Sequence, residues 1–160
     1  MKLHSFILAA LTASTLPAQC LFTTVTTQSI GPSCNAPSTG FCAIAAIPAS
    51  LSTLLDTANC SLEVAVNAFS GCGATVPLRF LVLGTQPAAV PLPEFGLGCM
   101  MHVAPAILLA TTTSSFPLNL PPNVASLNFL AQGAALSTFA FPGSSWNVLA
   151  FTAGLAISLQ

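Results

Sequence analysis

Hydrophobic and polar residues alternate along residues 61–69, which read SLEVAVNAF. The two alternating sets are Leu62, Val64, Val66 and Ala68 on one side of an extended chain, and Ser61, Glu63 and Asn67 on the other. Successive side chains of a β-strand point to opposite faces of its sheet. This pattern therefore predicts a strand with one face buried in a core.

Two further segments predict strands of different kinds. Residues 77–84, PLRFLVLG, are apolar on both faces, which favours a central strand that is covered on both sides and ends at Gly84. Residues 114–123, SSFPLNLPPN, place Phe116, Leu118 and Leu120 on one face, and the PPN turn of residues 121–123 ends that strand.

The C-terminal segment shows the longest alternation. The bulky set is Leu149, Phe151, Leu155, Ile157 and Leu159, and the small set on the other face is Ala150, Thr152, Gly154, Ala156 and Ser158. We expect one uninterrupted strand whose five bulky side chains share a single buried face.

Turn-forming clusters separate these segments, at GPSCNAPSTG, FSGCG, TQPAAVPLP, PPN and FPGSS. One short helix is predicted within residues 48–60, because Leu51, Leu54 and Leu55 have the spacing of a helix face. The remaining pattern indicates an all-β fold. We expect a single-domain, two-sheet antiparallel β-sandwich, jelly-roll-like and disulfide-linked, with about eight strands.

Charge is scarce in this chain of 160 residues, of which 54% are hydrophobic and 3% are charged. A globular protein carries roughly 25% charged residues. Membrane insertion does not explain the deficit, because Pro, Gly, Ser, Thr or Asn interrupts each apolar stretch beyond the leader before the ~20 residues that a spanning helix needs. We expect no transmembrane span and a water-facing surface of neutral side chains.

The first residues, MKLHSFILAALTASTLPAQC, have the features of a secretory leader. Lys2 provides the positive end, residues 6–11 form the apolar stretch, and Ala18 offers the cleavage point. We therefore predict a signal peptide over residues 1–18, a mature domain over residues 19–160, and a secreted or cell-surface location. The weaker alternative is a lipoprotein acylated at Cys20, which the large Gln19 before that cysteine disfavours.

Removal of the leader leaves one basic residue, Arg79, against Asp56, Glu63 and Glu94, so the side-chain charge is 1 − 3 = −2. Nucleic acid is therefore not an expected partner, because no basic surface remains to neutralise phosphates.

Six cysteines remain at or beyond the cleavage point: Cys20, Cys34, Cys42, Cys60, Cys72 and Cys99. An even number in an exported chain predicts three disulfides, for which 15 pairings are open. Zinc sites use close Cys pairs, which are absent from the sequence.

The segment GCMMHVAP is the main candidate for metal chemistry. On a strand, Cys99, Met101 and Val103 point to one face, while Met100 and His102 point to the other, so the four potential ligands do not converge. We expect no metal and no cofactor here, and a buried strand that carries a half-exposed histidine.

Catalysis is not expected either. A hydrolase would need His102 as its base and one of the three carboxylates as its acid, and no serine stands in a Gly-x-Ser-x-Gly turn. We therefore predict that the protein is not an enzyme.

The second half of the chain resembles an uncharacterised secreted β-sandwich domain that is common in planctomycete bacteria. The motifs that carry the resemblance are Gly84 after a leucine-rich strand, Gly98-Cys99, the turn at residues 121–123, and Ala131-Gln132 in an aromatic strand. The resemblance covers roughly residues 30–160, while Met101 and the additional cysteines depart from it. It implies export and a sandwich fold, and no known reaction.

These features together favour a secreted structural or interaction protein, with self-association or other envelope and extracellular proteins as its expected partners. A surface with little charge suits a subunit that is buried in an assembly. The alternative is a carbohydrate-binding, lectin-like module that uses Trp146 as its ligand platform.

Overall fold

The computed structural model describes residues 20–34, 49–68, 74–95, 99–141 and 143–160. Its strands are β1 (Val25–Ile30), β2 (Ser50–Asp56), β3 (Ser61–Asn67), β4 (Ala74–Gly84), β5 (Pro87–Pro91), β6 (Met100–Val103), β7 (Ile107–Thr111), β8 (Ser115–Asn119), β9 (Leu127–Phe141) and β10 (Ser144–Leu159). A short 3-10 helix, η1 (Pro93–Phe95), joins β5 to β6. The predicted all-β class is confirmed, with ten strands in the described residues.

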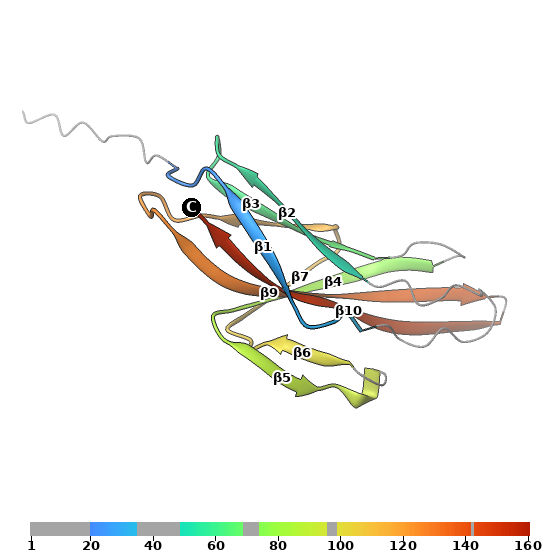
Figure 1. Cartoon of the computed structure of the whole chain (residues 1–160). Coiled ribbons are helices and arrows are strands. Elements are labelled where there is room, and N and C mark those ends of the chain that lie inside the picture. Colours follow the sequence, from blue (N-terminus) through green and yellow to red (C-terminus); the bar gives the residue numbers. More distant parts are fainter. Residues whose placement is uncertain (1–19, 35–48, 69–73, 96–98, 142) are drawn as a thin grey trace, which may run out of the picture.

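The strands form three antiparallel sheets. The five-stranded sheet has the order β1-β10-β9-β4-β7, the three-stranded sheet has the order β2-β3-β8, and β5 pairs with β6 in a hairpin. Figure 1 shows the five-stranded sheet in the middle, with the three-stranded sheet on one side and the β5–β6 hairpin on the other. We call the side toward the three-stranded sheet the inner face and the side toward the hairpin the outer face.

The main core lies between the inner face and the three-stranded sheet. Its fully buried members are Phe22, Leu62, Val64, Val66, Leu81, Ala131, Ala135, Ile157 and Leu159. The alternation predicted for residues 61–69 is confirmed, since Leu62, Val64 and Val66 are buried while Glu63 is exposed. The prediction for residues 77–84 is also confirmed, since β4 lies between β9 and β7 and ends at Gly84.

The predicted helix within residues 48–60 is wrong, because residues 50–56 form strand β2. Leu51 and Leu55 pack against the core, whereas the side chain of Leu54 is 66% exposed. The helical spacing of the three leucines is therefore accidental. Pairing of β2 with the strongly alternating β3 determines the local structure.

The predicted turn cluster TQPAAVPLP is also corrected, because it contains strand β5. Its prolines stand at the two ends of that strand, Pro87 and Pro91. Proline is tolerated in a sheet at an edge, where its missing N–H donor is not needed.

The C-terminal strand contains a β-bulge that the alternation does not reveal. Phe151 pairs with Ala134 and Gly154 pairs with Gln132, so two residues, Thr152 and Ala153, stand opposite one. The extra residue reverses the facing of everything that follows it. The predicted single face of five bulky side chains is therefore wrong.

The two halves of β10 bury their bulky side chains on opposite sides of the sheet. Leu155, Ile157 and Leu159 lie on the inner face, where Ile157 and Leu159 are fully buried. Leu149 and Phe151 pair with Leu136 and Ala134 and lie on the outer face, where both are only partly buried.

Candidate functional site

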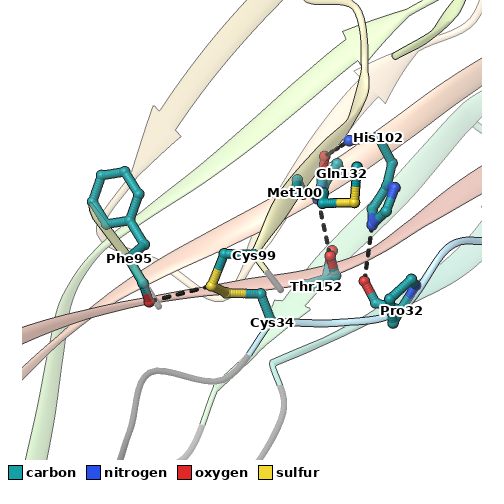
Figure 2. Close-up of a disulfide and its surroundings, with 8 residues drawn as sticks. All are labelled: Pro32, Cys34, Phe95, Cys99, Met100, His102, Gln132 and Thr152. Atoms are coloured by element: carbon teal, nitrogen blue, oxygen red, sulfur yellow. Dashed lines mark hydrogen bonds between the residues drawn. A yellow bond between two sulfur atoms is a disulfide. The ribbon is translucent and has the colours of Figure 1, made fainter. Parts of the chain in front are cut away.

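The outer face carries a buried polar cluster beneath the β5–β6 hairpin, formed by the side chains of His102 and Gln132 and the main-chain carbonyl of Thr152. Figure 2 shows these three residues beside the Cys34–Cys99 disulfide. His102 is only 8% exposed, so the prediction of a half-exposed histidine is wrong. The prediction considered this strand by itself. In the structure β6 lies against β9 and β10, which are distant in sequence, and Gly31 also covers the imidazole.

The imidazole of His102 makes one hydrogen bond within the described residues. Its Nε2 lies 3.0 Å from the carbonyl oxygen of Pro32. A carbonyl oxygen only accepts hydrogen bonds, so Nε2 carries the proton and donates it. Gly31 has φ of 79°, and a Cβ atom at that position would meet the imidazole ring. The ring is thus fixed between the main chain after β1 and the outer face of the sheet.

Gln132 uses both ends of its amide to hold the hairpin to the sheet. Its Oε1 accepts from the main-chain N–H of His102 at 2.7 Å. Its Nε2 donates to the carbonyl oxygens of Met100 at 3.0 Å and Thr152 at 3.1 Å. A buried amide that is satisfied in this way stabilises and orients, because leaving any of these groups unpaired would be costly.

Thr152 stabilises the bulge itself. Its hydroxyl accepts from the N–H of Gly133 at 2.8 Å and donates to the carbonyl oxygen of Ala153 at 2.7 Å. Among the described residues, no buried side-chain nitrogen or oxygen lacks a partner. The cluster therefore joins β6, β9 and β10 structurally.

Gln132 entered the sequence analysis only as part of the Ala131-Gln132 motif and was given no role, although it is a polar residue in the largely apolar segment LNFLAQGAAL. A glutamine in the middle of a long strand is a signal of an internal hydrogen-bond node, because buried polar groups need partners.

Two of the three predicted disulfides lie within the described residues. Cys20 pairs with Cys60, and Cys34 pairs with Cys99. Cys42 and Cys72 lie outside the described residues. The Cys20 sulfur is thus bonded to Cys60, which contradicts the lipoprotein alternative.

The disulfide at Cys99 removes one candidate ligand from the GCMMHVAP strand. Its Sγ lies 3.2 Å from the carbonyl oxygen of Phe95, a close contact in which a disulfide sulfur has no proton to donate. In the part of the chain that the structure describes, no three His, Cys, Asp or Glu side chains gather in a way that could hold a metal ion.

The residues considered for catalysis lie in different layers. Asp56 and Glu63 belong to the three-stranded sheet, while His102 lies on the opposite side of the five-stranded sheet. Glu94 is exposed in η1. Asp56 accepts from the side chain and N–H of Asn59 and the N–H of Ala58. These bonds, led by the Asn59 side chain, hold the pKa of the carboxyl below its ordinary value.

The side chain of Arg79 is partly buried and links separate strands. Its Nε donates to the carbonyl oxygen of Val66 at 3.1 Å. Its Nη1 approaches three further carbonyl oxygens, those of Val76, Thr112 and Thr113, at 3.3–3.4 Å. The guanidinium therefore joins the end of β3 to β4 and to the turn between β7 and β8.

A hollow of about 260 Å³ lies among β1, β2 and β10. Ser29, Ser33, Ser50 and small or aliphatic side chains line it. These residues supply hydroxyls but no acid, base or imidazole, so the hollow offers no catalytic or metal-binding group among the described residues.

Apart from Gln132, the paired residues of the outer face described next are apolar. Three cross-strand rows of the outer face can be followed in the register: Leu78-Leu136-Leu149, Ala110-Phe80-Ala134-Phe151, and Leu108-Val82-Gln132-Gly154. The hairpin covers one end of these rows, where Phe95 packs edge-to-face on Phe151 with ring centroids 5.3 Å apart. At the other end lie β7 and the exposed side chain of Leu108.

Trp146 lies in β10 opposite Phe139. Its side chain falls outside what the structure describes, so its role as a ligand platform stays a prediction.

The chain matches no known protein family, no curated protein and no solved structure. The resemblance to the planctomycete β-sandwich domain thus also stays a prediction. No helix of the described residues is long and apolar enough to cross a membrane.

Proposed function

We propose that this protein is an exported structural or interaction subunit of an extracellular or cell-surface assembly, without catalytic activity. The observation that carries the proposal is the character of its described exterior. Large aliphatic side chains are exposed on it, at Leu21, Leu54, Val90, Ile107 and Leu108, while the four charged residues beyond the leader are scattered over separate elements.

Charge on a protein surface keeps molecules apart, and its absence favours association. Charges buried in an interface carry a desolvation penalty, so a neutral surface suits a subunit whose exterior becomes interior on assembly. The two disulfides support export, because disulfides persist in oxidising compartments. The polar cluster supports a non-catalytic role, because the Gln132 amide and the imidazole N–H of His102 are hydrogen-bonded within the fold.

Sedimentation velocity of the mature, oxidised protein over a wide concentration range tests the proposal. We expect a mass above that of the monomer that rises with concentration. A monomer at every concentration would contradict it. A monomer whose heat of binding to polysaccharides saturates would favour the carbohydrate-binding alternative instead.

A further inference from the structure

The five-stranded sheet ends at two edges, β1 on one side and β7 on the other. A strand at an edge presents a row of main-chain N–H and C=O groups to an additional strand. Natural proteins protect such edges with charged side chains, prolines or bulges, and a polar edge strand offers a second copy little apolar surface to bury.

Most edges in the described residues are protected. Strand β8 contains Pro117, and β5 contains Pro87 and Pro91. Strand β1 carries two threonines, a glutamine and a serine, and β2 carries two serines, a threonine and Asp56. Each of these edges thus has a proline, a charge or several polar side chains.

Strand β7 differs from all of them. Its sequence is ILLAT, with neither proline nor charge, and its register with β4 runs without a shift from Leu83↔Ile107 to Arg79↔Thr111. The side chains of Ile107 and Leu108 are 53% and 64% exposed, although consecutive residues of a strand point to opposite faces. The described residues thus leave one aliphatic side chain exposed on each face of this edge, at Ile107 and Leu108, while Leu109 packs against the core.

We propose that β7 is the self-association edge of the protein, and that it pairs antiparallel with β7 of a second copy across a two-fold axis. This inference rests on the proposed function and names its interface. With the axis at Leu109, Leu108 of one copy stands opposite Ala110 of the other, and Ile107 stands opposite Thr111. The two five-stranded sheets become one continuous sheet.

The chemistry of β7 favours a second copy over a charged partner. With the two-fold axis at Leu109, a charge at residues 108–110 would lie directly opposite or diagonal to its own copy. Residues 107–111 carry none. The pairing therefore brings no like charges together.

The apolar rows of the outer face extend the same contact. Leu108 continues into Val82, and Ala110 continues into Phe80. Across the proposed axis these rows run from one sheet into the next, so aliphatic side chains meet aliphatic side chains on both sides of the seam. Burial of these apolar side chains drives the association. The new main-chain hydrogen bonds add little net free energy, because they replace hydrogen bonds to water.

Two exposed leucines provide a matched test, because the side chains of Leu108 and Leu54 are 64% and 66% exposed and both lie on edge strands. The Leu108→Lys variant places two ammonium groups diagonally across the seam, and we expect its dissociation constant to rise about tenfold or more. The Leu54→Lys variant adds the same charge to a different sheet and should associate like the unmodified protein. Sedimentation velocity measures both, and circular dichroism with disulfide mapping verifies that each variant is folded.

Hydrogen exchange of the unmodified protein provides a second measurement that needs no variant. Amides of β7 should exchange more slowly in concentrated than in dilute solution, while those of β1, the other edge of the same sheet, should not change. If the unmodified protein associates and Leu108→Lys associates equally well, or β7 gains no protection, the β7 interface is wrong and the proposed function remains. A monomeric unmodified protein would overturn both.

Discussion

Polar side chains of this protein bond chiefly to its own main chain. The imidazole of His102 donates to a carbonyl oxygen, the amide of Gln132 bonds three main-chain groups, and the guanidinium of Arg79 reaches four carbonyl oxygens. In other proteins such side chains often act as acids, bases or ion-pair partners. In this protein they bond to main-chain groups that the regular β-sheet pairing leaves without a partner, at a bulge, a hairpin and a turn. At the scale of the residue, the polar atoms therefore serve the fold.

The contact between His102 and Gly31 predicts a large effect of one methyl group. Gly31→Ala should destabilise by roughly 2 to 5 kcal/mol, because it adds overpacking against the imidazole to the strain of positive φ. Gly143→Ala is the matched control, since Gly143 has φ of 86° and nothing within 4 Å of an added Cβ. Gly143→Ala should lower the stability only by the strain of positive φ, about 1 to 2 kcal/mol. Denaturant unfolding measures both, and equal losses would show that the imidazole does not lie over Gly31.

The hydrogen bonds to Asp56 predict a pH effect of defined sign. Its pKa is below the ordinary value of 3.8 in the folded protein, so its stabilising contribution is present above that value and is lost as the pH falls through the folded pKa. Titration of the carboxyl carbon by NMR should give a midpoint below 3.8, and Asn59→Ala should move it upward. A midpoint that Asn59→Ala leaves unchanged would remove this side chain as the cause.

At the scale of the element, the alternation of hydrophobic and polar residues predicted a strand correctly where the buried side chains of that strand all face one core. The alternating residues 61–69 and the apolar residues 77–84 became β3 and β4, because a period of two directly reports which side chains meet a core. The bulge at Thr152-Ala153 was not predictable in this way, since one extra residue shifts the period without changing the composition. The burial of His102 was equally hidden, because a hairpin distant in sequence from β9 and β10 produces it.

The bulge predicts that alanine substitution lowers the stability by unequal amounts at two residues that the alternation placed on one face. Ile157→Ala should cost roughly 2 to 5 kcal/mol, because Ile157 is fully buried on the inner face. Leu149→Ala should cost about 1 to 2 kcal/mol, because Leu149 is only partly buried on the outer face. Urea denaturation under oxidising conditions compares the two. A loss at Leu149 as large as the one at Ile157 would contradict the reversal of facing at the bulge.

At the scale of the whole molecule, the disulfides and the sheets together hold a chain with little charge. Cys20–Cys60 links the segment before β1 to the turn between β2 and β3, and Cys34–Cys99 links the segment after β1 to the start of β6. Each bridge thus joins the five-stranded sheet to one of its two covering layers. The even cysteine count predicted that these cysteines pair, but their connectivity depends on which elements meet in space.

Those two bridges use four of the six cysteines, so the prediction of three disulfides requires Cys42 to pair with Cys72. The mature protein, which we predict to begin at or near Gln19, should take up no alkylating agent before reduction and six equivalents after it. Intact mass spectrometry measures both numbers, and digestion of the unreduced protein identifies the linked peptides. Alkylation before reduction, or a peptide linking Cys42 to any other cysteine, would contradict the assignment.

The central claim is that a neutral exterior associates by burying apolar and main-chain groups. The dependence of the dissociation constant on salt tests this most directly, because screening weakens contacts between exposed charges and leaves apolar contacts intact. We expect sedimentation equilibrium of the mature protein to give the same association, or a stronger one, as sodium chloride is raised from low to high concentration. Association that weakens steeply with salt, or a protein that stays monomeric at every salt concentration, would contradict the account.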